Sequence, residues 1–165
     1  MVTTAIAILL LVALDRASKV LATALLVGRG TVEILPGILG LYYLEGGNTG
    51  AAFGMFKGNT MILIVLTAVV VVLLIYCLFC RQFASKLMKI AAVLITAGGI
   101  GNLYDRIVYG YVTDFFRFLF IEFPIFNVAD CLVCVGAALV VLSVLLSPKD
   151  APLFTKKNDA ADGNG

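Results

Sequence analysis

Five polar residues stand at helical spacing in a segment that is otherwise largely apolar, residues 98–130. Asn102, Asp105 and Arg106 occupy positions i, i+3 and i+4, so on a helix their side chains share one face. Asn127 and Asp130 repeat the i, i+3 spacing where the next apolar run begins. Ionisable side chains at or near a bilayer are energetically costly, so their presence here predicts a functional site.

A third acid, Asp114, lies between these two groups, so that three carboxylates fall near the ends of neighbouring apolar runs. Two carboxylates that are held close together cannot easily both ionise, so one keeps its proton while the other accepts a proton from water. Aspartic proteases cleave amides with such a pair. Spacing alone does not fix which two acids form the pair. Because Asp105 has Arg106 beside it and is expected to form a structural ion pair, Asp114 and Asp130 are favoured.

The chain contains no histidine. This excludes a Ser–His or Cys–His nucleophile and a His-ligated metal. Two C-x-x-C pairs, Cys77 with Cys80 and Cys131 with Cys134, resemble a four-thiolate zinc site. The first pair ends one apolar run and the second begins another at the opposite side of the membrane, about 30 Å away. We therefore predict no metal, no cofactor and no structural disulfide.

The composition indicates a membrane protein. The chain is 62% hydrophobic with a mean hydropathy of +1.09, whereas a soluble domain is about 45–50% apolar. Four runs are long enough for a membrane-spanning helix, which needs about 20 residues: 4–27, 60–80, 84–106 and 126–146. This predicts an all-α membrane protein with four transmembrane helices, forming a single domain over residues 1–165. A net charge of +2 without a basic run argues against nucleic acid as a partner.

The longest segment outside the four runs, residues 28–58, contains two β-prone stretches. They cover 32–35 and 39–45, and turn residues separate them. A pair of strands is only marginally stable by itself, so we expect this pair to lie on the membrane surface against the helices. Asn48 follows in a glycine-rich stretch and offers both a hydrogen-bond donor and an acceptor.

Basic residues indicate how the chain crosses the membrane. Six of the twelve Lys and Arg residues lie between the second and third runs, at the start of the third, or after the fourth. By the positive-inside rule these parts of the chain are cytoplasmic. Both termini are then cytoplasmic, and the loops that carry the acidic cluster face outward. The small, polar residues 148–165 are predicted to be disordered.

The first apolar run carries three charged residues in its second half: Asp15, Arg16 and Lys19. These charges, and the lack of a basic start, argue against a cleaved signal peptide and favour a retained helix. Arg16 and Lys19 are long enough to reach the interface by snorkelling, which we predict for them. Asp15 is too short for that, so we assign it to the functional site.

Four blocks of residues, in this order, resemble the lipoprotein signal peptidase family (signal peptidase II), which are bacterial membrane aspartic proteases. The blocks are Leu14-Asp15 with Ser18-Lys19; residues 48–54; residues 98–106 with Val112-Thr113-Asp114-Phe115; and Phe126-Asn127-Val128-Ala129-Asp130. They extend over residues 14–130. The resemblance implies that Asp114 and Asp130 are the catalytic pair, in agreement with the chemical argument.

The resemblance implies further properties. It implies supporting or substrate-contacting roles for six residues: Asp15, Asn48, Asn102, Asp105, Arg106 and Asn127. It implies a small extracytoplasmic β-cradle after the first helix, which holds substrate beside the pair. The implied substrate is a diacylglyceryl-modified prolipoprotein, cut before the lipidated cysteine in the bacterial inner or cytoplasmic membrane, among membrane lipids. The family is inhibited by the peptide antibiotic globomycin, and we expect a monomer.

Two other functions fit parts of the pattern. A small proton-coupled transporter would use Asp15, Asp105 and Asp130 as a relay. Such a relay needs acids distributed through the depth of the bilayer, whereas here they gather at one side and the second helix has none. A non-catalytic membrane scaffold would leave the costly polar residues unexplained. The sequence therefore favours the peptidase.

Overall fold

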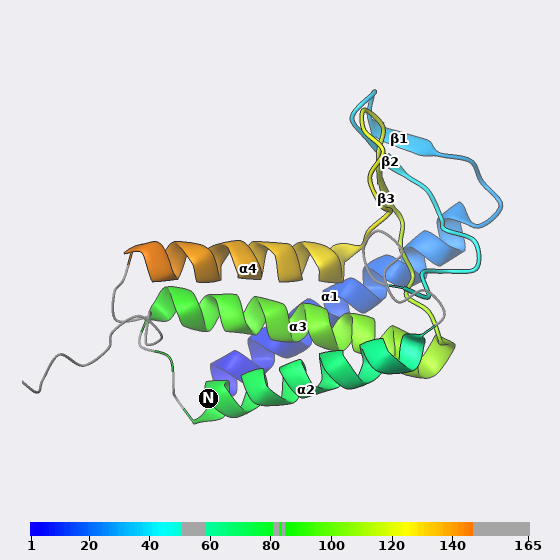
Figure 1. Cartoon of the computed structure of the whole chain (residues 1–165). Helices are drawn as coiled ribbons and strands as arrows, with labels where there is room; N and C mark the ends of the chain where they lie inside the picture. The colour runs from blue at the N-terminus through cyan, green and yellow to red at the C-terminus, as the bar shows by residue number, and fades with distance from the viewer. Residues whose placement is uncertain (51–58, 81–82, 84, 147–165) are drawn as a thin grey trace, which may run out of the picture.

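Four α-helices pack into a bundle, and a small three-stranded sheet stands at one end of it (Figure 1). The computed structural model describes residues 1–50, 59–80, 83 and 85–146. The helices are α1 (Val2–Leu26), α2 (Thr60–Phe79), α3 (Lys86–Tyr109) and α4 (Val128–Leu146). Helix α3 is central, because it packs against each of the other three helices. The predicted tail at residues 148–165 lies outside the described residues.

Helix α3 has a clear signal at each end. At its start, Ser85 Oγ accepts a hydrogen bond from the backbone N–H of Met88 at 3.0 Å, which is the usual action of an N-cap serine. At its end, Gly110 adopts φ 80° and donates its N–H to the carbonyl of Arg106 at 3.1 Å. A left-handed glycine at this position stops a helix, because residues with a side chain rarely adopt this conformation. The chain therefore turns sharply just before Asp114.

Three helices of the described chain are long and apolar enough to cross a membrane: α2, α3 and α4. Helix α1 has the length but carries Asp15, Arg16 and Lys19 in one stretch, so its composition alone does not qualify it. The membrane fold is thus confirmed, while the fourth crossing stays a prediction. Helix α2 has a mean hydropathy of 3.3 and exposes most of its side chains, which is typical of a lipid-facing helix.

The sheet has the order β1-β2-β3 and is antiparallel throughout. Strands β1 (Val32–Leu35) and β2 (Leu39–Leu41) form a hairpin. The prediction for β1 is confirmed, and β2 ends earlier than the predicted stretch 39–45. The third strand, β3 (Phe116–Phe118), comes from the connection between α3 and α4 and was not predicted. By pairing with β2, it joins the segment that follows α1 to the connection between α3 and α4, at the same end of the bundle (Figure 1).

Close packing of α3 on α4 depends on small residues. A Cβ atom added to Gly98 would lie 2.8 Å from Val133 Cγ2 and would clash with the backbone carbonyl of Ala129. At the other end of the contact, a Cβ on Gly136 would lie 2.9 Å from the carbonyl of Ala91. Small residues let transmembrane helices approach closely. This approach brings the first turn of α4 against the C-terminal half of α3.

Candidate active site

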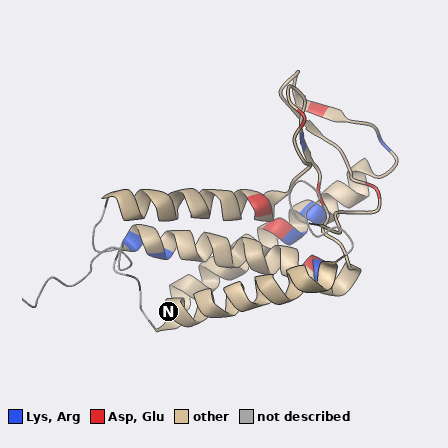
Figure 2. Cartoon of the chain, in the orientation of Figure 1, with Lys and Arg blue, Asp and Glu red and all other residues tan. Residues whose placement is uncertain are grey.

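Buried polar side chains gather where the bundle meets the sheet. Charged residues are concentrated at this end of the bundle, and at the opposite end they lie at the start of α3 (Figure 2). The fully or almost fully buried members come from α1, α3 and the connection before α4: Asp15, Lys19, Asn102, Asp105, Asp114 and Asn127. Asp130, in the first turn of α4, is partly buried beside them. Buried charges are stable only when paired or hydrogen-bonded, so the contacts of each one matter.

Asp130 is held by a reciprocal cap at the start of α4. The side chain of Asn127 accepts a hydrogen bond from the backbone N–H of Asp130 at 3.0 Å, and the N–H of Asn127 donates to Asp130 Oδ2 at 3.0 Å. This is the geometry of a capping box, with Asn and Asp in place of Ser and Glu. The second oxygen, Oδ1, accepts from Asn102 Nδ2 at 2.8 Å. Both oxygens of this carboxylate therefore have a fixed donor.

Asp114 is held by two other amides. Its Oδ1 accepts from Asn127 Nδ2 at 2.6 Å, and its Oδ2 accepts from Asn48 Nδ2 at 2.8 Å. Asn48 is brought there by the backbone, because it exchanges two hydrogen bonds with Val112, at 2.8 and 2.9 Å. Asn127 thus contacts both carboxylates, Asp114 through its side chain and Asp130 through its backbone.

The environment of Asp114 favours its protonated form. Burial raises its pKa from the ordinary value of 3.8 to about 7, and the nearby charge of Asp130 adds to the increase. Hydrogen bonds from Asn48 and Asn127 act in the opposite direction, as does the charge of Lys19. Desolvation and a like charge both disfavour a second negative charge at the site. Asp114 can therefore hold a proton near neutral pH, which is what an acid–base pair requires.

Lys19 lies at the centre of the network and is only 1% exposed. Its Nζ is 2.9 Å from Asp15 Oδ2, 3.0 Å from Asp105 Oδ2 and 3.0 Å from Asn102 Oδ1. The prediction that Lys19 snorkels to the interface is therefore wrong. Its ammonium group turns inward because two buried carboxylates offer it stronger partners than the headgroup region. Arg16 also turns to the network and pairs with Asp105.

Asp105 has a different cation from the one that the sequence predicted. It pairs with Arg16 and Lys19, and its Oδ2 accepts from the backbone N–H of Thr113 at 3.2 Å. Its neighbour Arg106 instead donates from Nη2 to the carbonyl of Gly50 at 3.0 Å. The predicted pair of Asp105 with Arg106 is therefore wrong, because consecutive helical residues point about 100° apart and face different parts of the site.

Asp15 connects α1 to both of the other helices at the site. Its Oδ1 accepts a hydrogen bond from the backbone N–H of Ala129 at 2.9 Å, in the first turn of α4. Its Oδ2 lies where a Cβ on Gly101 of α3 would approach to 2.5 Å. Gly101 thus leaves the space that this carboxylate occupies. Asp15 thus holds the backbone at Ala129, the residue before Asp130.

A pocket of about 610 Å³ opens onto the two carboxylates. We call it the dyad pocket. Its polar side chains belong to Asn48, Thr67, Asn102, Arg106, Asp114 and Asp130. Its other walls are apolar and come from α2, α3, α4 and the connection after β3. Such a pocket can hold an apolar molecule with one polar group at the carboxylates.

The structure brings all eight sequence-predicted residues to one end of the bundle, although Asp15, Asp105 and Asn127 do not line the pocket. It adds Arg16 and Lys19, which the sequence analysis assigned to the interface. The sequence did contain a signal for the ion pair of Lys19 with Asp15, because Lys19 is four residues after Asp15 and lies on the same helix face. Among the described residues no group of three or more Asp, Glu or Cys residues is arranged to hold a metal ion. None of the four cysteines, all of them within the described residues, forms a disulfide.

Comparison with known proteins adds a family to this geometry. The family model described as signal peptidase (SPase) II matches residues 7–146. Among curated relatives, the lipoprotein signal peptidase of Clostridium tetani is 40% identical over 143 residues, covering 85% of this chain and 90% of the relative. That of Enterococcus faecalis is 38% identical and covers 86% of this chain and 87% of the relative.

Solved structures agree with the sequence comparison. A bacterial membrane enzyme determined by the in meso method at 2.3 Å resolution superposes with a TM-score of 0.78 and 26% identity, covering 95% of this chain and 94% of the other. A second, determined at 1.9 Å, gives a TM-score of 0.76 and 28% identity, covering 89% and 95%. The family model matches most of the chain, and the curated relatives are named lipoprotein signal peptidase. This chain therefore belongs to the signal peptidase II family of membrane peptidases.

Proposed function

We propose that this peptidase removes signal peptides from diacylglyceryl-modified prolipoproteins, cutting before the lipidated cysteine, and that Asp114 and Asp130 are its catalytic pair. The relatives named lipoprotein signal peptidase support the substrate class. The observation that carries the catalytic assignment is the position of the two carboxylates: both line the dyad pocket, and both are held by Asn127.

The two acids have different environments, which suggests their roles. Asp130 lies in the first turn of α4 and accepts a backbone N–H there, and the positive end of a helix favours an ionised carboxylate. Asp114 holds a proton near neutral pH, because burial and the charge of Asp130 raise its pKa to about 7. We therefore assign Asp130 as the base and Asp114 as the acid.

The reaction then follows the chemistry of a carboxylate pair. Asp130 takes a proton from a water molecule, and the water oxygen attacks the carbonyl carbon of the scissile amide. The C–N bond breaks as Asp114 gives its proton to the leaving nitrogen. The products are the signal peptide with a free carboxylate and the lipoprotein with a free amino group on its cysteine. The pair is ready for another cycle once the proton that Asp130 took from water has passed to Asp114.

The dyad pocket suits a lipidated peptide. Apolar side chains of α2 and α4 line it, including Leu66, Val70 and Val133, and they match acyl chains and a hydrophobic signal sequence. Arg106 also lines it, and its buried Nε has no hydrogen-bond partner within the described part of the chain. An N–H of this kind is available to a substrate carbonyl. Binding of the apolar parts of the substrate to these walls, and of a substrate carbonyl to Arg106, would hold the scissile amide beside Asp114 and Asp130. Such positioning accelerates the reaction.

The proposed orientation places the sheet and the site at the outer face of a bacterial cytoplasmic membrane. Helix α1 is the fourth crossing, with its charges neutralised by α3. Lys86 and Lys89 stand at the opposite end of the bundle from the sheet, in the first turn of α3. The positive-inside rule puts that end, and both termini, in the cytoplasm. The enzyme works as a monomer, since all of the proposed site residues come from one chain.

The test is cleavage of a diacylglyceryl-modified prolipoprotein peptide by the purified protein in detergent. Asp114→Asn and Asp130→Asn should each abolish cleavage while the thermal unfolding profile and lipopeptide binding persist. Glu33→Gln makes the same chemical change on the exposed strand β1 and should leave cleavage unchanged. Globomycin should inhibit the parent. Full activity in both aspartate variants would refute the pair, and an uncut peptide with folded parent would refute the function.

A further inference from the structure

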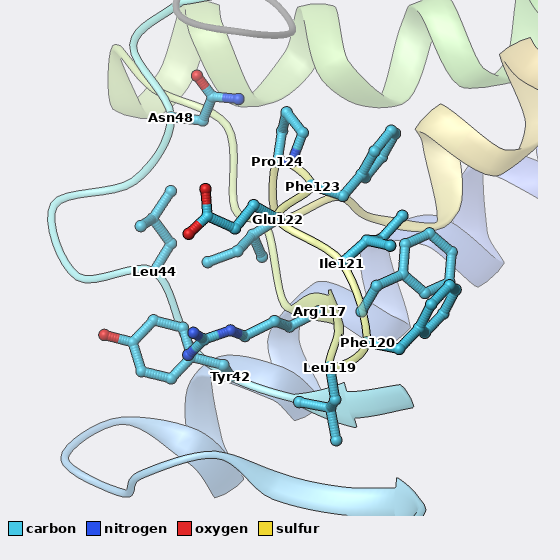
Figure 3. Close-up of a pocket in the computed structure, with 12 residues that line it drawn as sticks. Tyr42, Leu44, Asn48, Arg117, Leu119, Phe120, Ile121, Glu122, Phe123 and Pro124 are labelled. Atoms are coloured by element: carbon cyan, nitrogen blue, oxygen red, sulfur yellow. The ribbon is translucent and has the colours of Figure 1, made fainter. Parts of the chain in front are cut away.

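A second concave surface lies outside the helix bundle, between the sheet and the connection that follows β3 (Figure 3). Its volume is about 850 Å³. We call it the outer groove. Residues from both sides line it: Tyr42, Leu44 and Asn48 on one side, and Arg117 and Glu122 on the other. The groove thus combines apolar and charged side chains.

The outer groove begins at the proposed catalytic pair. Asn48 lines both the groove and the dyad pocket, and it donates to Asp114 at 2.8 Å. The wall between the two spaces is shared as well, because Phe118 and Phe123 line both of them. Their rings pack edge to face, with centroids 5.5 Å apart. A chain that is cut at Asp114 can therefore leave along the groove.

The backbone fixes the direction of the groove. Leu44 donates its N–H to the carbonyl of Asp114 at 3.3 Å, and Tyr42 donates to the carbonyl of Phe115 at 2.9 Å. This ladder continues into the pairing of β2 with β3. Residues two apart on an extended strand face the same side, so Tyr42 and Leu44 together form one edge of the groove. The groove runs from Asp114 toward the sheet and away from the helices.

Two opposite charges stand along this path. The Arg117 guanidinium lies 5.5 Å from the centroid of the Tyr42 ring and donates to Thr31 Oγ1 at 3.3 Å, which fixes its position. Glu122 is exposed and has no hydrogen-bond or ion-pair partner among the residues that the structure describes. In the view of Figure 3, the Glu122 carboxylate lies between Asn48 and Arg117. A chain leaving the site would meet Glu122 first.

We propose that the outer groove binds the residues that follow the lipidated cysteine, and that Glu122 selects a basic side chain close to the cut. This rests on the proposed function. The signal sequence and the acyl chains are apolar and fit the dyad pocket, whereas the residues after the cysteine belong to the mature, water-facing part of the substrate. They need a polar path that starts at Asp114 and leads out of the bundle. The outer groove has this position and this chemistry.

The experiment compares three lipidated peptides that differ only at the second residue after the cysteine, which is Lys, Ser or Asp. The parent should cut the Lys peptide with a kcat/KM about two- to fivefold above that of the Asp peptide, the range of one exposed ion pair. Glu122→Lys should reverse this order, and Glu122→Gln should abolish it. Because the pair is exposed, raising the salt concentration should also reduce the preference.

Controls separate this proposal from the proposed function. Glu33→Lys reverses the charge of an exposed acid on β1 and should keep the parent order. Glu33→Lys should also cut the Ser peptide at the parent rate, whereas the Glu122 variants are judged by the ratio of kcat/KM between the Lys and Asp peptides; if Glu122→Lys does not fold, Glu122→Gln and the salt dependence decide. Equal rates for the Lys and Asp peptides in the parent, or an unchanged ratio in the Glu122 variants, would overturn the groove assignment with cleavage intact. Failure to cut any peptide would overturn the proposed function instead.

Discussion

Lys19 and Asn102 meet in the interior of the bundle, where Lys19 Nζ donates to Asn102 Oδ1 across 3.0 Å. An ammonium group can only donate hydrogen bonds, so the oxygen of the Asn102 amide has to face Lys19. The nitrogen of the same amide then faces Asp130, to which it donates at 2.8 Å. Asn127 Nδ2 donates to the same oxygen at 3.1 Å, so Lys19 and Asn127 together fix which end of Asn102 reaches the proposed base.

Replacing Lys19 by Met should lower both stability and cleavage. The change leaves Asp15 without its cation in a buried position, and breaking one side of a buried ion pair costs about 3–5 kcal/mol. It also removes one of the two donors, Lys19 Nζ and Asn127 Nδ2, that hold the Asn102 oxygen in place. Thermal unfolding and the cleavage rate in detergent measure the two effects. Lys89→Met, at an exposed position at the start of α3, should change neither.

A second variant separates positioning from stability. Adding Asp15→Asn to Lys19→Met removes the uncompensated charge, so part of the lost stability should return. Cleavage should stay below that of the parent, because among the described residues Asn102 Oδ1 then keeps the donor Asn127 Nδ2 and has lost Lys19. Recovery of cleavage together with stability would show that Lys19 has only a structural role.

Cleavage should decline as the pH rises above about 7. If Asp114 supplies the proton to the leaving amine, the active form disappears as this carboxyl ionises, and its pKa is raised to about 7. The measurement is kcat/KM from pH 5 to pH 9 with a substrate that does not titrate in that range. A constant kcat/KM between pH 6 and pH 9 would contradict the assignment of Asp114 as the acid.

The same carboxyl should make stability depend on pH. Its pKa is higher in the folded chain, about 7, than its ordinary value of 3.8, so the folded state binds the proton more tightly. The contribution of Asp114 to stability is then fully present below about pH 4 and is lost as the pH rises through 7. Between pH 5 and pH 8 the thermal midpoint of the parent should fall more than that of Asp114→Asn. Equal falls would contradict the raised pKa.

Asn48→Ala should move the upper limit of the pH profile to higher pH. The hydrogen bond from Asn48 lowers the pKa of Asp114, so its loss raises that pKa. One pKa unit corresponds to 1.36 kcal/mol, and a hydrogen bond to a charged group contributes about 1.5–3 kcal/mol. We expect a shift of about one pH unit in kcat/KM. Asn59→Ala, at an exposed helix start where the side chain makes no cap bond, should show the parent profile.

Gly98→Ala should separate α3 from α4. The added methyl group would clash with the Ala129 carbonyl, which belongs to backbone and cannot turn aside. Overpacking of this kind costs about 1–3 kcal/mol, and it moves Asp130 away from Asn102. Both the thermal midpoint and cleavage should fall. Gly30→Ala has no atom within 4 Å of the new group and should behave like the parent.

The helices were predictable from the sequence because their signal is local. A long apolar run has few alternatives in a membrane protein, and the predicted runs differ from α1 to α4 by a few residues at each end. Strand β3 was missed because it is three residues long and its partner, β2, lies far away in sequence. Nothing within Phe116–Phe118 itself distinguishes a strand from a loop.

The sequence predicted which residues form the site better than it predicted which of these residues contact one another. Residue types and i, i+3 spacing identified Asn102, Asp105, Asn127 and Asp130, since these properties survive in the sequence. The partner of Asp105 was assigned to the neighbouring Arg106, whereas α1 supplies it through Arg16 and Lys19. Which helix packs against α3 is a property of the tertiary structure, and so sequence neighbours could not determine it.

The polar contacts of α1 have a consequence for biosynthesis. In the proposed topology α1 crosses the membrane. Until α3 is present, it then carries Asp15, Arg16 and Lys19 into the bilayer with few partners, at a cost of about 2.5–3.5 kcal/mol for each charge at the centre. Asp105 and Asn102 then supply partners to Lys19, and Ala129 supplies a donor to Asp15. Helix α1 is thus stabilised by α3 and α4, which are synthesised after it. A ribosome-bound chain that stops before α3 should hold α1 poorly in the membrane, and the contacts of α1 become complete only when α4 has entered.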